Sequence, residues 1–292
     1  MRTLALTLLF ACGGSSSAPE TTTTAPAPAA HPAFDVKVSG AGRPVIFIPG
    51  LGSPGAVWDG TVAHLNGKVQ AHVLTLAGFA GQPAIQPPFL LSVHDQLVDY
   101  IKHLDHPIVV GHSLGGAMSL WLAETNSVDL GGIVDVDGLP FIAAILDPTM
   151  TEAKAAETAK QIAAGMGGGT HEQFVEQTQK FVSTMVTSEK DQKFLADAAA
   201  RSDQHAFANA FAELYAKDLR ADLPKITTKV TLVIATEQRG DVPRPQLEAA
   251  WHAQIDALKG ADVHFVDHAK HFVMLDQPDA FYALLDQVVA AH

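Results

Sequence analysis

"PIVVGHSLGGAMSL" occupies residues 107–120 and joins a run of β-branched apolar residues to a helix-like segment through Gly-His-Ser-Leu-Gly-Gly. The pattern Gly-x-Ser-x-Gly is typical of a sharp turn between a buried strand and a helix, with the serine in a strained conformation. The flanking glycines keep side chains away, and the helix start directs N–H groups and its positive dipole end at the serine. We therefore predict that Ser113 is a nucleophile rather than a simple helix cap.

Further apolar runs extend this pattern on both sides of the turn. Short β-branched segments that end in Gly, His or Thr predict parallel strands buried on both faces. These segments are residues 44–50, 72–78, 131–138, 230–236 and 261–268. The predicted helices are residues 55–65, 91–104, 114–124, 246–258 and 278–289. Strands and helices in alternation indicate an α/β fold, with a mostly parallel central sheet flanked by helices.

One interval, from residue 139 to residue 228, contains no convincing strand and is rich in Ala, Glu, Lys and Gln. Its predicted helices are residues 151–165, 171–185 and 191–219. Helices inserted between two strands of a sheet are expected to form a cap. The predicted organisation is a core of residues 34–138 and 229–292, interrupted by a helical cap of residues 139–228.

The N-terminus has a different character. "MRTLALTLLFACGG" carries one positive charge at Arg2 and then a short apolar core, which is the shape of an export signal. "LFAC" resembles the lipobox of bacterial lipoproteins, so residues 1–12 are the predicted signal and Cys12 the predicted site of lipidation. Residues 13–33 are the predicted flexible linker, because a segment of Gly, Ser, Thr, Ala and Pro cannot bury enough apolar surface to fold.

These features predict an exported bacterial protein with a lipid anchor, on the periplasmic or cell-surface side of a membrane. The alternative is a secreted soluble protein with an ordinary signal peptide and an incidental cysteine. The formal net charge of −12 argues against nucleic acid as a partner and against electrostatic docking on anionic lipid. Membrane contact is therefore expected only through the N-terminal anchor.

A serine hydroxyl is a poor nucleophile near neutral pH until a base takes its proton. "HAKHFVMLDQPDAF" places His271 after the last predicted strand and ahead of a predicted helix, so His271 is the predicted base. The nearby His264 and His268 raise the alternative of a metal site, but no matching set of carboxylates or cysteines accompanies them. We expect no metal and no cofactor.

A tetrahedral intermediate also needs hydrogen-bond donors for its oxyanion. The backbone N–H of Leu114, the residue after the nucleophile, is one predicted donor. The glycine-rich loop "PGLGSPG" at residues 49–55 follows a predicted strand, and the N–H of Leu51 is the predicted second donor.

Four segments, "FIPGLGSPGAVW", "VLTLAGFAGQP", "VVGHSLGG" and "KHFVMLDQP", follow one another along the chain. From about residue 35 to its end, the chain resembles the α/β-hydrolases, and in particular their serine esterases and lipases. Pro49 stands where many members have His before the oxyanion glycine. We expect this departure to alter the packing of the loop and to leave the backbone donor in place.

The resemblance implies a third catalytic residue, a carboxylate that orients the histidine. In most of the family it follows the strand that corresponds to residues 230–236, where this chain has Glu237 early and Asp241 late. The other position used in the family is the end of the preceding strand, which here closes on Asp137. An aspartate there faces the active-site crevice of an open α/β sheet. Asp137 is the predicted acid, and Asp241 is the alternative.

The expected function is that of a serine hydrolase that cleaves small-molecule carboxylic esters through an acyl-enzyme on Ser113. Residues 139–146, with Met150, Met166 and Met185, are expected either to line an apolar acyl pocket or to pack the cap on the core. The resemblance also permits thioesterase, lactonase, carbon–carbon hydrolase or cofactor-free haloperoxidase chemistry. From a different class, a non-catalytic ligand-binding lipoprotein is the alternative.

Overall fold

The computed structural model of the protein describes residues 32–145, 147–237 and 242–291. The predicted signal segment and Cys12 lie outside the described residues, as do nearly all of the predicted linker and Asp241. Within the described ranges, no helix is long and apolar enough to cross a membrane.

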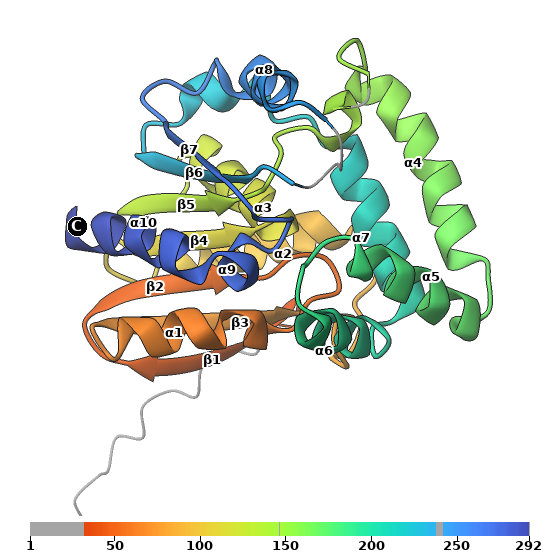
Figure 1. The fold of residues 1–292 in the computed structure, drawn as a ribbon, viewed down its shortest axis with the longest axis horizontal. Helices are drawn as coiled ribbons and strands as arrows, with labels where there is room; N and C mark the ends of the chain where they lie inside the picture. The colour runs from red at the N-terminus through yellow and green to blue at the C-terminus, as the bar shows by residue number, and fades with distance from the viewer. Residues whose placement is uncertain (1–31, 146, 238–241, 292) are drawn as a thin grey trace, which may run out of the picture. The chain divides into compact units, whose positions relative to one another are not determined.

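The described residues form one seven-stranded sheet, in the order β1-β3-β2-β4-β5-β6-β7 (Figure 1). The strands are β1 Phe34–Gly40, β2 Arg43–Ile48, β3 Val69–Leu76, β4 Ile108–His112, β5 Gly132–Val136, β6 Val230–Ala235 and β7 Asp262–Val266. Neighbouring strands are parallel except β1, which pairs antiparallel with β3. The expected α/β fold with a mostly parallel sheet is confirmed.

Strand β1 was not among the strands predicted from the apolar runs. Its sequence is FDVKVSG, and only Phe34 in it is buried. An antiparallel edge strand tolerates solvent on one face, so Asp35 and Lys37 interrupt the apolar pattern. The strand forms through its backbone pairing with β3, which a hydrophobic run does not reveal.

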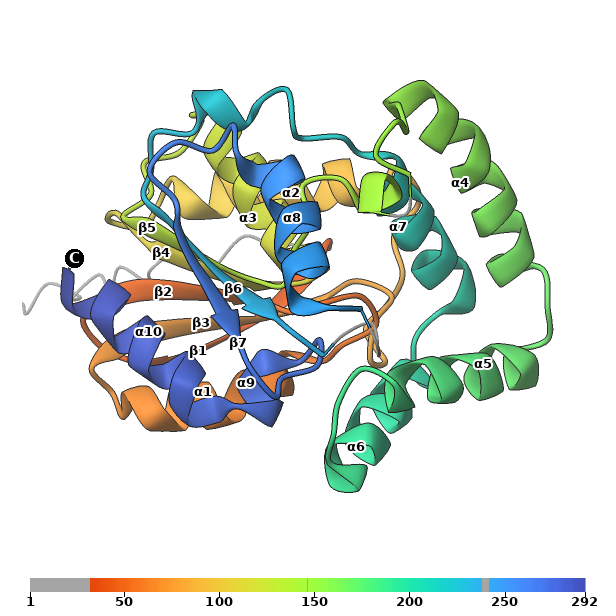
Figure 2. The same ribbon diagram turned by 45° about the horizontal axis from the view of Figure 1, so that its top comes forward.

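Helices cover both faces of the sheet and its carboxyl edge. Their bounds are α1 Asp59–Leu65, α2 Phe89–Ile101, α3 Leu114–Glu124, α4 Glu152–Gly167, α5 His171–Ser183, α6 Glu189–Ala199, α7 Gln204–Ala216, α8 Arg244–Ile255, α9 Val273–Asp276 and α10 Pro278–Ala291, with 3-10 turns η1 Gly55–Trp58, η2 Ile142–Ile145 and η3 Leu223–Lys225. Helices α1, α9 and α10 lie on one face, and α2, α3 and α8 lie on the other (Figure 2).

Each face of the sheet has its own apolar core, and β4 contributes to both. Val109 belongs to the core beneath α2, α3 and α8, together with Trp251. Ile108 and Val110 belong to the opposite core, together with Phe281 of α10. These side chains are at most 1% exposed, and burying one of this size contributes about 1.5–3 kcal/mol. Burial on both faces explains why β4 is a continuous apolar run.

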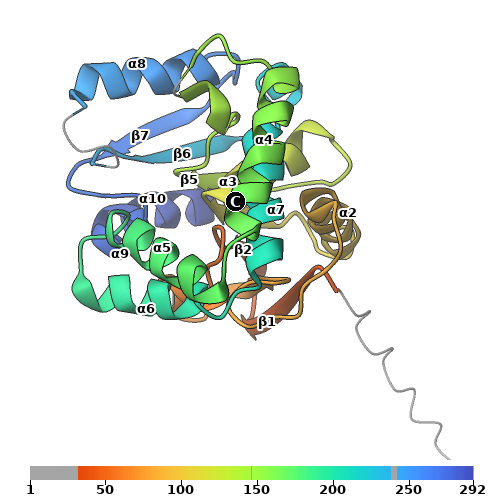
Figure 3. The same ribbon diagram turned by 90° about the vertical axis from the view of Figure 1, so that its right-hand side faces the viewer.

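Helices α4–α7 connect β5 to β6 and lie beyond the carboxyl ends of the strands (Figure 3). The helical segment predicted at 191–219 is divided here into α6 and α7. The division occurs because the Asp203 side chain accepts a hydrogen bond from the Ala206 N–H at 2.8 Å and so starts a new helix. In parallel α/β sheets the carboxyl edge is where ligands bind, and this edge is the one that α4–α7 cover.

Candidate active site

Ser113 occupies the turn between β4 and α3, in a conformation that side chains rarely adopt, with φ 56° and ψ −113°. The glycines around it permit this turn. A Cβ on Gly111 would lie 2.0 Å from the Gly115 carbonyl oxygen, and a Cβ on Gly115 would lie 2.2 Å from the Ile48 carbonyl oxygen. Both spaces are too small for any side chain, so the sequence pattern around Ser113 has a direct steric cause.

His271 lies in the loop between β7 and α9, and its Nδ1 is 2.5 Å from Oδ2 of Asp137. The Asp137 side chain is 0% exposed and that of His271 is 16% exposed. When the carboxylate accepts this hydrogen bond, the imidazole proton is on Nδ1, and Nε2 keeps a lone pair that can accept a proton. The pair therefore has the arrangement that a general base requires.

Asp137 follows the last residue of β5 and has a positive φ of 59°. Two hydrogen bonds fasten it to the next strand: its N–H donates to Val233 O at 2.9 Å, and its Oδ1 accepts from the Ala235 N–H at 3.1 Å. The carboxylate is thus fixed in place before it meets the histidine. Glu237, the early candidate in the following loop, instead has its Oε1 3.1 Å from Nδ1 of His268.

A second aspartate, Asp135, lies beneath this turn with a different role. Its Oδ1 accepts the Gly138 N–H at 2.9 Å and closes the turn that carries Asp137. Burial raises the pKa of Asp135 well above its usual range, which favours its neutral form.

The two predicted oxyanion donors belong to the loop after β2 and to the first turn of α3, two segments that adjoin Ser113. Leu51 lines the cavity described below, in a turn closed by Ser53 N–H donating to Gly50 O at 3.1 Å. A Cβ on Gly50 would lie 3.2 Å from the Ser113 Cβ, so this loop packs directly against the serine. Leu114 is the first residue of α3, and the first N–H groups of a helix have no acceptor within the helix.

His112 packs against His271 and contacts its backbone. It is completely buried, and its Nε2 is 3.0 Å from the His271 carbonyl oxygen. A carbonyl can only accept, so Nε2 of His112 carries the proton. Burial lowers the pKa of His112 well below its usual range, and the proximity of His271 lowers it further. Its adjacency to Ser113 gave no signal of this contact, which depends on how the loop between β7 and α9 folds back.

A cavity of about 300 Å³ brings these groups together. Ser113, Asp137 and His271 all line it, as does Leu51. The described side chains around them are largely apolar and include Leu139, Ile142, Phe181, Val182, Met185, Leu195, Phe207, Phe211 and Leu214. No Lys or Arg occurs among the described residues that line it. The cavity therefore suits an uncharged apolar group next to the serine.

The sequence predicts only part of this lining. Leu139, Ile142 and Met185 line the cavity, which is one of the two roles expected for their segments. Met150 packs in a separate cluster around Phe141, and Met166 packs against the core. The aromatic residues of α5 and α7 were missed, since composition does not indicate which face of a cap helix is turned inward.

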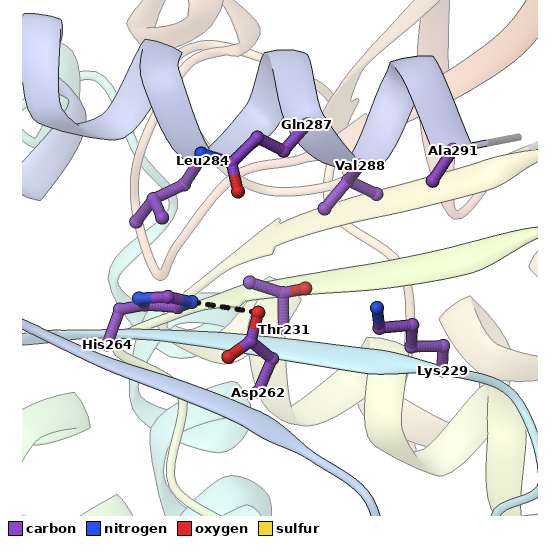
Figure 4. A pocket seen from close by; sticks show the side chains of 8 residues that line it. All are labelled: Lys229, Thr231, Asp262, His264, Leu284, Gln287, Val288 and Ala291. Atoms are coloured by element: carbon purple, nitrogen blue, oxygen red, sulfur yellow. Dashed lines mark ion pairs between the residues drawn. The ribbon is translucent and has the colours of Figure 1, made fainter.

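A second, smaller cavity of about 60 Å³ lies between α10 and the strands β6 and β7 (Figure 4). Thr231 and Asp262 belong to the first residues of those strands, so this cavity is at the opposite edge of the sheet from Ser113. Figure 4 shows His264 paired with Asp262, 3.0 Å apart. None of the described residues that line this smaller cavity is a serine in a strained turn, so the larger cavity is the candidate active site.

The three histidines that raised the alternative of a metal do not converge. His264, His268 and His271 each lie next to a different carboxylate. In the described part of the chain, no group of three or more His, Cys, Asp or Glu side chains could hold a metal ion.

Residues 45–284 match the protein family described as the alpha/beta hydrolase family. The pimeloyl-[acyl-carrier protein] methyl ester esterase of Vibrio atlanticus is 31% identical over 113 residues, which are 39% of this chain and 43% of that protein. The corresponding esterase of Vibrio cholerae is 30% identical over 108 residues, 37% of this chain and 42% of that protein. The chain thus spans less than half the length of these curated relatives.

Among solved structures, a hydrolase from Pseudomonas aeruginosa superposes with a TM-score of 0.72 and 16% sequence identity. The superposition covers 88% of this chain and 94% of that one. At this identity the likeness shows a shared fold alone.

Proposed function

The chain belongs to the alpha/beta hydrolase family, and from that premise we propose that it is a serine hydrolase that cleaves carboxylic esters through an acyl-enzyme on Ser113. One observation carries the proposal. A serine in a strained turn and a pair formed by the buried Asp137 and the partly buried His271 line the same cavity, although they follow three different strands. Structural roles alone would not require this combination of strain, burial and charge.

In the proposed acylation step, Nε2 of His271 takes the proton from Ser113 Oγ while that oxygen attacks the ester carbonyl. Asp137 keeps Nδ1–H in place and stabilises the imidazolium that forms. The backbone N–H groups of Leu51 and Leu114 donate to the oxyanion of the tetrahedral intermediate. The imidazolium then protonates the departing alkoxide, and the acyl group stays on Ser113.

The acyl-enzyme is resolved by the same groups. His271 removes a proton from a water molecule, which attacks the acyl carbon, and the second tetrahedral intermediate expels Ser113 Oγ. The acid product leaves, and the proton on His271 returns to Ser113. All proton transfers use side chains of this chain, so the reaction needs no cofactor.

Because the cavity lining is largely apolar, we infer that the cavity binds the acyl part of the ester and that this acyl group is uncharged. The names of the Vibrio relatives describe hydrolysis of a methyl ester, which supports ester chemistry for this chain. We propose that small-molecule esters with apolar acyl groups are its substrates.

The test compares residues 34–292 with their Ser113→Ala variant on p-nitrophenyl esters of increasing acyl length. Hydrolysis that falls by at least about 10³-fold in the variant supports the serine mechanism. A fluorophosphonate probe supplies an independent readout, because it labels an activated serine whatever the natural substrate. Absence of both hydrolysis and labelling in the unmodified chain would favour a binding protein and contradict the proposed function.

We also propose that the chain is exported and anchored through a lipid on Cys12, with the segment up to residue 33 as a tether. The sequence around Cys12 supports this proposal. Its test is fractionation of full-length protein and a Cys12→Ser variant expressed in a bacterial host. Lipid labelling and membrane recovery that depend on Cys12 are expected, and equal recovery of both proteins in the soluble fraction would contradict the anchor.

A further inference from the structure

The loop that carries His271 is attached to the cap as well as to the sheet. We call residues 267–272, between β7 and α9, the histidine loop, and residues 184–188, between α5 and α6, the cap link. The N–H of Phe272 donates to the carbonyl oxygen of Met185 at 3.3 Å. The residue that follows the proposed base is therefore bonded directly to the cap.

The residue that precedes the base is connected to the cap through a carboxylate. Oδ2 of Asp276 accepts the Lys270 N–H at 2.8 Å. Oδ1 of the same side chain accepts the Thr187 N–H at 2.8 Å. One half-buried carboxylate in α9 thus binds the histidine loop with one oxygen and the cap link with the other.

Apolar packing supports the same junction. Val186 of the cap link and Ala269 of the histidine loop are both 0% exposed, and they belong to one core cluster with Phe272. The Gln192 side-chain amide donates to the Val186 carbonyl at 3.1 Å, which fastens the cap link to α6. The junction is therefore built from several contacts rather than from a single hydrogen bond.

We propose that Asp276 is a positioning residue that locks the histidine loop to the cap link, so that the cap helps to place His271 for proton transfer. This inference rests on the proposed function, in which His271 is the base. Asp137 contacts the side chain of His271, and His112 donates to its carbonyl oxygen. The residues on either side of it, Lys270 and Phe272, are both tied to the cap link, Lys270 through Asp276. A cap attached in this way covers the cavity and also helps to hold the histidine loop in place.

The same junction connects substrate binding to the base. Met185 lies in the cap link and also lines the cavity, so an acyl group packed on it contacts the segment that holds the histidine loop. Binding energy from a non-reacting part of the substrate can then favour the reactive placement of His271. The expected signature of losing the lock is a fall in kcat with little change in KM.

The Asp276→Asn variant tests this directly. Asparagine has the shape of aspartate but only one acceptor oxygen, so it cannot accept hydrogen bonds from both the Lys270 and the Thr187 N–H groups. Asp279→Asn is the matched control, because Asp279 is an exposed carboxylate three residues along the chain. Three quantities are measured on the full-length protein: kcat and KM on a p-nitrophenyl ester, the rate of fluorophosphonate labelling, and amide hydrogen exchange by mass spectrometry.

We expect kcat and the labelling rate of Asp276→Asn to fall about tenfold or more, with KM within about twofold of that of Asp279→Asn, since small misplacements of a catalytic group have effects of this size. Amide exchange is expected to accelerate in the cap link and in the histidine loop together. Faster exchange confined to the histidine loop, or unchanged kcat and labelling despite faster exchange in both segments, would overturn the proposal.

The two proposals fail in different ways. An unmodified chain that neither hydrolyses esters nor reacts with the phosphonate would contradict the proposed function. The exchange measurement would still decide whether Asp276 joins the two segments, because it needs no substrate.

Discussion

Nδ1 of His271 lies 2.5 Å from Oδ2 of Asp137, although 134 positions separate the two residues in the chain. Asp137 follows β5, and His271 follows β7, with β6 between these strands in the sheet. The contact spans β6 because Asp137 accepts the Ala235 N–H and leans across the end of that strand. The carboxylate that contacts His271 therefore comes from the end of β5.

Asp137→Asn should lower kcat by about 10³–10⁴-fold, because the amide cannot stabilise the imidazolium and favours the wrong tautomer. Asp241→Asn is the comparison, since Asp241 is the alternative acid in the sequence. It should retain activity within a few-fold of the unmodified chain. The measurement is kcat for ester hydrolysis by both variants. A larger loss of kcat in Asp241→Asn than in Asp137→Asn would show that Asp241 is the acid.

The turn at Ser113 is expected to reduce the stability of the fold. A non-glycine residue at φ 56° and ψ −113° costs about 1–3 kcal/mol, and alanine would keep this strain while glycine would relieve it. Ser113→Gly should therefore be more stable than Ser113→Ala by about 1 kcal/mol, with both variants inactive. Urea denaturation measures the difference. An alanine variant at least as stable as the glycine variant would show that the turn is not strained.

Phe211 of α7 lines the cavity and is only partly buried, so its removal should widen the cavity at a modest cost in stability. Phe211→Ala should raise kcat/KM for long acyl chains relative to short ones by about tenfold. Phe194→Ala is the matched control, because Phe194 is partly buried in the cap but packs against the core. A series of p-nitrophenyl esters gives the ratio, and equal profiles for the two variants would mean that Phe211 does not shape the acyl site.

Glu124, the last residue of α3, should make the protein less stable at neutral than at mildly acidic pH. Its pKa is raised from 4.5 to about 7, chiefly by burial and further by Asp222, against the opposing effect of Lys217 and Lys225. Between the ordinary pKa of 4.5 and the raised pKa of about 7, the folded state binds more protons than the unfolded state. The free energy of unfolding therefore decreases as the pH rises through this range. After allowance for solvent screening, the loss is about 1–2 kcal/mol.

The measurement is the free energy of unfolding in urea at pH 5 and at pH 8. Glu124→Gln removes the titrating group, so its stability difference between the two pH values should be smaller by that amount. Asp105→Asn serves as the control, because the Asp105 side chain is 96% exposed. A Glu124→Gln variant with the same pH dependence as the control would contradict the raised pKa.

Much of the site could be predicted from the sequence because it is built from local elements. The turn at Ser113 needs glycines at fixed offsets, and the atoms they would hit lie within a few residues or on the adjacent strand β2. The loop of Leu51 and the position of His271 likewise follow from where an apolar run ends. Strand β1 escaped prediction because an exposed edge strand has no apolar run to recognise.

The sequence predicts that the cap is a helical insertion, but not which of its side chains face the cavity. Composition and periodicity indicate helices, yet the inward position of Phe207 and Phe211 depends on how α7 packs over the carboxyl edge of the sheet. The attachment of Asp276 to Thr187 has no signature in either segment, because each partner is a backbone N–H that every residue but proline carries.

The sequence by itself determined the alternation of strands and helices, the strained turn at Ser113 and the identity of the histidine loop, because hydrophobic periodicity and steric requirements act over short stretches of chain. Only the tertiary structure decided which described carboxylate reaches His271. Two adjacent parallel strands end at the same edge of the sheet, so either loop could in principle supply the acid. The choice depends on hydrogen bonds such as that from Ala235 to Asp137, which form only once β5 and β6 are paired.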